Sequence, residues 1–237
     1  MKKQAKTDYG EMTILDHLDE LRQRLIKVVI AVLIGVIAGT FVTPPVLKLL
    51  VAPLGDQVPI AISPTEAPAV FFKVAIVVGL VISMPVIIYQ LFQFARPGLE
   101  SHEQKYVIIG APIASLSFAL GVVFAALVLL PAALPFLQGF LFGIVEQRYS
   151  IDLYVSFVSN ILVWAGVVFE TPLVMYFLAK LGVVDHEGFA KARRLVVIGA
   201  AAGAAVITPT TDPVNMLLVM VPFMLLYELG ILLARLA

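Results

Sequence analysis

The chain has 237 residues, of which 61% are hydrophobic and only 14% are charged. A soluble domain is typically about 45–50% apolar and about 25% charged, so this composition leaves too little polar surface for a water-facing enzyme. Sixteen Lys and Arg balance sixteen Asp and Glu, which indicates no general affinity for nucleic acid. The absence of Cys excludes disulfides, and three His offer little for a metal site. The composition predicts an integral membrane protein without a cofactor.

Six apolar segments lie between charged or Pro/Gly-rich boundaries and are predicted to span the bilayer. In chain order they cover residues 25–43, 69–92, 106–130, 153–179, 195–207 and 214–233. The fifth reaches only roughly 20 Å as a helix, against a hydrocarbon core of roughly 30 Å. The last two therefore form a short hairpin, which turns at residues 208–213 because two prolines cannot continue a helix. Four prolines inside the spans predict kinked helices: Pro85, Pro112, Pro172 and Pro222.

The basic residues are distributed unevenly over the two sides of this layout. With both termini and the even-numbered loops in the cytoplasm, thirteen Lys and Arg lie on that side and two on the other. This positive-inside bias predicts cytoplasmic N- and C-termini. The N-terminus resembles neither a signal peptide nor an organelle transit peptide, which favours a prokaryotic inner membrane. The expected fold class is thus an all-α membrane protein, with residues 1–237 forming one six-span domain.

Residues 11–24 are predicted to form an amphipathic helix on the cytoplasmic interface, leading into the first span. Ile14 and Leu18 begin an apolar face at helical spacing, and Glu20 and Arg24 lie on the polar face. An ordinary i,i+4 ion pair between Glu20 and Arg24 is the simplest interpretation. The alternative is that Glu20 offers its carboxylate to a cationic partner.

The turn after the second span carries a further carboxylate. Pro97 ends the span, Ser101 is suited to cap the next helix, and Glu103 falls in that helix's first turn, where the macrodipole favours an anion. A structural role alone explains these residues. Glu20 and Glu103 nevertheless share the cytoplasmic side, and two carboxylates would suit a ligand with two guanidinium groups.

Glu170 lies inside the fourth predicted span, where an unpaired charge costs at least about 2.5–3.5 kcal/mol. It is expected to be protonated, paired or in a wet cavity. Pro172 cannot donate to the carbonyl group of Val168, so a protonated Glu170 could supply a local donor instead. A functional role for Glu170 is favoured over this structural one. Lys73 and Glu228 are expected to extend from their spans to the nearby membrane interfaces.

Five groups of residues, in this order along nearly the whole chain, resemble the TatC family, the multi-spanning subunit of the twin-arginine protein translocase. They are His17–Leu25, Ala52–Leu54, Pro85–Gln90 with Phe94, Pro97 and His102-Glu103, then Phe169–Pro172, and Thr208-Pro209 with Pro222 and Tyr227-Glu228. In the turn before the last span the family usually has a Ser-Gln pair, whereas this chain has Val214-Asn215-Met216.

The resemblance implies a non-enzymatic signal-peptide receptor and scaffold that exports folded proteins with energy from the proton-motive force. Its ligands would be signal peptides with two consecutive arginines, and its partners the single-span subunits TatA and TatB and further copies of itself. It also implies roles for particular residues: Glu20 and Glu103 receive the arginines, Arg22, Leu25, Phe94 and Pro97 shape the cytoplasmic patch, Pro53 supports an outer cap, and Glu170 is the intramembrane docking site for partners.

Two other functions fit the residues less well. A proton-coupled transporter of a small solute would use Glu170 as a relay, but only one deep ionisable residue and two short final spans suit it poorly. A purely structural assembly factor leaves Glu170 unexplained. Retained solute uptake by a Glu170→Gln variant would argue against the relay.

Overall fold

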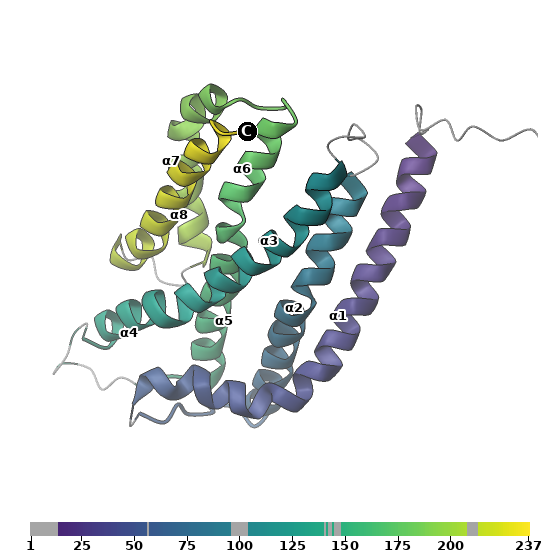
Figure 1. Ribbon diagram of the computed structural model, residues 1–237. Helices are drawn as coiled ribbons and strands as arrows, with labels where there is room; N and C mark the ends of the chain where they lie inside the picture. The colour runs from purple at the N-terminus through teal and green to yellow at the C-terminus, as the bar shows by residue number, and fades with distance from the viewer. Residues whose placement is uncertain are drawn as a thin grey trace, which may run out of the picture.

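The structure, a computed structural model, describes residues 14–55, 57–95, 104–139, 141, 144, 148–207 and 213–237. Within these ranges the predicted all-α class is confirmed, and Figure 1 shows helices that run between two ends of the molecule. The helices are α1 (Ile14–Val51), the 3-10 turn η1 (Ala52–Leu54), α2 (Glu66–Ala95), α3 (Gln104–Phe124), the π-helical η3 (Ala125–Leu129), α4 (Leu130–Gly139), α5 (Ile151–Phe169), α6 (Thr171–Lys180), α7 (His186–Ile207) and α8 (Pro213–Ala234).

The first helix is longer than the sequence predicts. α1 continues without a break from Ile14 through the first predicted span, so the described part of the amphipathic segment is the first part of a 38-residue helix rather than a separate element. Pro44 and Pro45 lie inside this helix and lack the N–H groups that its ladder needs. The helix bends towards its end, and its last turns lie across the bottom of the view in Figure 1.

α1 packs mainly against α2, and small residues bring the two backbones together. A Cβ atom added at Gly39 would lie 2.6 Å from the carbonyl oxygen of Ala75, and one added at Gly79 would lie 2.5 Å from the backbone nitrogen of Val36. The hydroxyl group of Ser83 also donates to the carbonyl oxygen of Ala31 at 2.8 Å. Small residues and interhelical hydrogen bonds are the usual means of helix association in a bilayer.

The third span continues past its predicted end at residue 130. α3, η3 and α4 form one long helical rod to Gly139, with a π-helical segment in its middle. Pro131 lies two residues after the end of that segment and has no N–H group for the carbonyl of Leu127. The rod crosses α5 closely, since a Cβ atom added at Gly121 would lie 2.6 Å from the carbonyl oxygen of Ala165.

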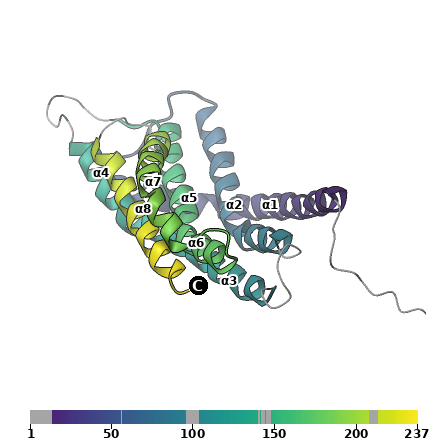
Figure 2. The same ribbon diagram turned by 90° about the horizontal axis from the view of Figure 1, so that it is seen from above.

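The predicted bend before Pro172 is confirmed, because α5 ends at Phe169 and α6 begins at Thr171. α5 contributes more residues than any other helix to the largest buried apolar cluster, in which Val155 and Val158 are fully buried between α2 and the η3–α4 segment. α5 is thus the central helix of the described structure, which is clear in Figure 2, where α1 extends away from the other helices.

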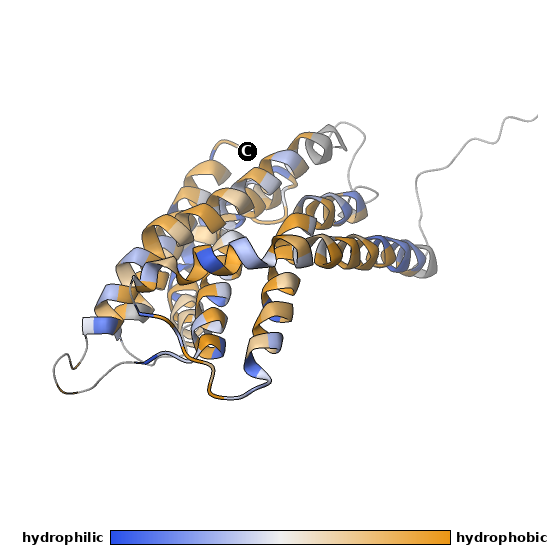
Figure 3. Cartoon of the chain, turned by 90° about the horizontal axis from the view of Figure 1, so that it is seen from below, coloured by the Kyte–Doolittle hydropathy of each residue, from blue (hydrophilic) through white to orange (hydrophobic). Residues whose placement is uncertain are grey.

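The final hairpin differs from its prediction in where its first helix begins. α7 starts at His186, nine residues before the predicted span, and includes the basic residues Lys191, Arg193 and Arg194. Only its second half is apolar. Among the described residues, five helices are long and apolar enough to cross a membrane, and α7 is not one of them. Figure 3 shows apolar residues along most of each helix, with hydrophilic ones concentrated at the start of α1 and near helix ends.

The ends of the helices gather at two opposite ends of the molecule. One, here called the Glu20 end, gathers the start of α1, the end of α2, the end of α6 and the C-terminus at the top of Figure 1. The other, here called the cap end, contains η1 and the starts of α2 and α5. There Ile60 forms a short parallel bridge with Ser150, and its N–H group donates to the carbonyl oxygen of Tyr149 at 2.9 Å.

Candidate functional site

The Glu20 end holds a small polar cluster between α1 and α2. Arg24 donates to the Oε1 atom of Glu20 at 2.8 Å, so the predicted i,i+4 ion pair is confirmed. The same guanidinium group donates to the Oε1 atom of Gln90 in α2 at 3.2 Å. Arg24 therefore holds Glu20 in place and also joins the two helices. Gln90 belongs to a motif of the sequence, but only the structure brings it to this cluster.

Glu20 keeps one carboxylate oxygen free in this cluster. Its side chain is only 16% exposed, and its Oε2 atom is buried without a hydrogen-bond partner among the described residues. Buried carboxylate oxygens normally accept hydrogen bonds, and a guanidinium group is the donor whose fork best matches a carboxylate. The Oε2 atom of Glu20 can therefore still accept a hydrogen bond from a ligand.

The structure also describes three other residues of the predicted patch: Phe94, Arg22 and Leu25. The ring of Phe94, near the end of α2, stacks on the His17 ring with centroids 4.4 Å apart. Arg22 and Leu25 are exposed on α1, and Leu25 is 58% exposed. Glu103 and Pro97 lie outside the described residues, so the two-carboxylate arrangement stays a prediction.

Pro53 lies at the cap end, far from this cluster along α1. It is the central residue of η1, which follows the bent end of α1. The next residue, Leu54, is 4% exposed and joins the main apolar cluster. Pro53 therefore lies beside an anchor of the cap, and its supporting role remains a prediction.

Glu170 lies at the break between α5 and α6, and its side chain does not repair the broken ladder. The backbone N–H of Glu170 donates to the carbonyl oxygens of Val167 and Val168, and the Ser117 hydroxyl of α3 donates to that of Phe169 at 2.7 Å. The idea that a protonated Glu170 side chain supplies the missing donor is therefore wrong. Its Oε1 atom is buried and has no hydrogen-bond partner within the described ranges.

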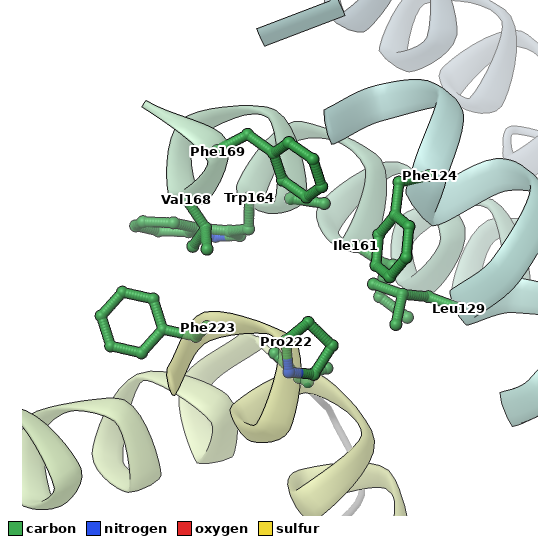
Figure 4. A pocket seen from close by; sticks show the side chains of 10 residues that line it. Phe124, Leu129, Ile161, Trp164, Val168, Phe169, Pro222 and Phe223 are labelled. Carbon is green, nitrogen blue, oxygen red and sulfur yellow. The ribbon is translucent and has the colours of Figure 1, made fainter. Parts of the chain in front are cut away.

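A small apolar cleft lies next to this break, between α5, η3 and α8. Figure 4 shows Trp164 and Phe169 of α5 facing Pro222 and Phe223 of α8 across it. Pro222 interrupts the backbone ladder of α8 at this level. The cleft offers apolar contact and no catalytic group, and the described residues contain no group of three His, Cys, Asp or Glu that could hold a metal ion.

Two charged residues are paired rather than extended towards the interfaces as predicted. Lys73 donates to the carboxylate of Asp152 across α2 and α5. The carboxylate of Glu228 accepts hydrogen bonds from Nε and Nη2 of Arg193, at 2.6 and 2.8 Å, and this pair joins α8 to α7. The sequence placed these residues at the correct ends of their spans but could not identify the partner helix. In each case an ion partner lies close enough to satisfy the charge locally.

Comparison with known proteins gives consistent results along the chain. The family described as Sec-independent protein translocase protein (TatC) matches residues 16–222. The TatC protein of Aquifex aeolicus is 38% identical over 232 residues, covering 95% of this chain and 96% of the relative. The chloroplastic TATC protein of Pisum sativum is 36% identical over 241 residues, covering 99% of this chain and 67% of the relative.

A solved structure agrees with the sequence matches. The crystal structure of a twin-arginine translocase receptor, TatC, superposes with a TM-score of 0.85 at 38% sequence identity. The match covers 93% of this chain and 98% of the other. The arrangement of the helices and the sequence therefore indicate the same family.

Proposed function

This chain belongs to the TatC family, and from that membership we propose that it is the signal-peptide receptor and core scaffold of a twin-arginine translocase. It is a multi-pass protein of the inner membrane. In this role it exports folded proteins with energy from the proton-motive force and catalyses no covalent chemistry. The transporter alternative loses its basis, because the chain belongs to a family of protein translocase subunits.

The observation that carries the receptor proposal is the free oxygen of Glu20. A side chain that is 16% exposed, held by Arg24 and left with an unpartnered Oε2 atom is preorganised to accept a second guanidinium group. One arginine of the signal peptide binds there, and the other binds Glu103. Arg22, Leu25, Phe94 and Pro97 complete the patch.

The proposed orientation places the Glu20 end in the cytoplasm and the cap end outside. The uneven distribution of Lys and Arg supports it, and the start of α1 and the C-terminus lie at the same end of the molecule. α7 then crosses as the fifth of six spans, with its basic first half at the cytoplasmic interface. Residues 1–237 form one membrane domain in which Pro53 supports the outer cap.

The partners proposed for the membrane interior are the single-span TatA and TatB subunits. The unpartnered Oε1 atom of Glu170 and the apolar cleft beside it supply a hydrogen-bond acceptor and an apolar surface at neighbouring positions. An apolar helix with one polar side chain fits such a surface. Self-association of this chain completes the complex.

The test is binding of a signal peptide with an Arg-Arg pair, and of its Lys-Lys version, to the purified protein in lipid nanodiscs. We expect Glu20→Ala and Glu103→Ala each to weaken Arg-Arg binding by about tenfold or more, since a hydrogen bond to a charged group contributes about 1.5–3 kcal/mol. Asp19→Ala is the matched control, because Asp19 is an exposed carboxylate next to Glu20. It should leave binding unchanged.

Two results would contradict the proposal. Equal binding of both peptides would show that the site does not distinguish a guanidinium group from an ammonium group. Equal losses of affinity in all three variants would show that only the overall negative charge matters. If the purified chain binds neither peptide, TatB is added to the nanodisc. Continued failure then rejects the receptor function.

A further inference from the structure

Polar side chains follow one face of α5 from the cap end into the membrane. Asp152, Ser156 and Asn160 succeed one another at intervals of four residues. At about 100° and 1.5 Å per residue they lie within about 80° of one another and extend about 12 Å along the helix. The next residues on this face, Val163 and Val167, are apolar. The polar stripe therefore starts at the cap end and stops inside the membrane.

Lys73 of α2 occupies the outermost part of this stripe. Its ammonium group donates to the carboxylate of Asp152 and to the Ser156 hydroxyl, the latter at 2.7 Å. The side chains of Lys73 and Asp152 are each 36% exposed. The pair is therefore open on one side and is not sealed in the protein core.

Asn160 is the innermost polar residue of the stripe. Its side chain is exposed, and it makes no side-chain hydrogen bond to any residue in the described ranges. An amide in hydrocarbon without partners is unfavourable, because both its donors and its acceptor lose water. Something other than the described part of this chain must satisfy Asn160.

We infer that Lys73, Asp152, Ser156 and Asn160 form a water-binding notch in the membrane, open at the cap end and reaching at least to Asn160. Each polar residue lies about 6 Å along the helix from the next, a gap that one or two water molecules bridge. Water is available at the cap end, where the loops lie. A partner helix would have to place a polar group opposite Asn160, whereas water entering from the cap end supplies both donors and acceptors there.

The notch has a consequence that rests on the proposed function. A polar stretch of a translocated chain that enters the bilayer beside α5 keeps part of its hydration there. The penalty for entering the membrane is lower on this face than on the apolar faces of α2 and α5.

The absence of Cys from the chain makes the notch directly testable. Single cysteines are introduced by Ser156→Cys and Asn160→Cys, and their reaction with a membrane-impermeant, charged thiosulfonate is timed in proteoliposomes that contain this chain alone. Val58→Cys, at a position 84% exposed in the cap-end loop, gives the rate of a fully accessible thiol. Ile76→Cys is the control for depth, since Ile76 is 55% exposed and the eleventh residue of α2, while Asn160 is the tenth of α5.

We expect Ser156→Cys and Asn160→Cys to react within about tenfold of Val58→Cys, and Ile76→Cys to react at least about 100-fold more slowly, because only a hydrated thiol ionises. Val167→Cys, on the same face but deeper, should react as slowly as Ile76→Cys. If Asn160→Cys is as slow as Ile76→Cys in protein that keeps its wild-type melting temperature, the notch is rejected. The assay uses no signal peptide, so its outcome is independent of the Arg-Arg binding test.

Discussion

Ser117 shows how one hydroxyl group stabilises the break in the central helix. Its hydroxyl donates to the carbonyl oxygen of Phe169 at 2.7 Å, whereas the hydroxyl of Ser115 on the same helix donates only to its own helix, at Ala111. We predict that Ser117→Ala lowers the free energy of unfolding by about 0.5–2 kcal/mol, because the carbonyl at the break loses its donor. Ser115→Ala should cost less than about 0.5 kcal/mol, since helix-internal back-bonding adds little. Denaturation in detergent compares the two; equal losses would contradict this role.

The ion pair between Lys73 and Asp152 leads to a second prediction. Its side chains are each 36% exposed, between a surface pair and a buried pair. Lys73→Met should therefore destabilise the protein by about 1–2 kcal/mol, since it leaves a carboxylate without its cation. The double variant with Asp152→Asn should recover part of that loss. A double-mutant cycle with thermal denaturation measures the coupling, and strictly additive losses would mean that the pair contributes nothing.

At the scale of helices, the crossing of α1 and α2 depends on the absence of side chains at two glycines. A Cβ atom at Gly79 would lie 2.5 Å from the backbone of Val36, which cannot move aside as a flexible side chain could. Gly79→Leu should thus destabilise the pair by about 1–3 kcal/mol or more, as overpacking typically does. Gly199→Leu in α7 is the control, because nothing lies within 4 Å of its added Cβ. Similar melting temperatures for both variants would contradict the close crossing.

The helix boundaries show where reasoning from the sequence succeeds. The break before Pro172 was predictable, because the missing N–H of a proline acts within four residues of its own position. The start of α7 at His186 was not, since apolar length indicates where a helix can cross a membrane and not where its charged first turns begin. The continuity of α1 was missed for the same reason: a change from amphipathic to apolar sequence need not interrupt the backbone.

For the whole molecule, the proposed orientation can be tested with two cysteines. Val58 is 84% exposed at the cap end, and Leu236 is 77% exposed next to the C-terminus. An impermeant thiol reagent should label Val58→Cys in intact cells and Leu236→Cys only after permeabilisation, because the positive-inside bias directs the C-terminus to the cytoplasm. Labelling of both residues in intact cells would mean that α7 does not cross.

The sequence by itself determined that this is an all-helical membrane protein, which segments are apolar and where prolines bend them, since these properties depend on composition and on residues within a few turns. It also indicated the family and Glu20 as a candidate. Only the tertiary structure decided that Gln90 accepts a hydrogen bond from Arg24 beside Glu20, that Lys73 pairs with Asp152, and that Asn160 has no partner within the described residues. Those contacts join helices far apart in the chain, and side-chain spacing within one helix carries no information about which neighbour it will face.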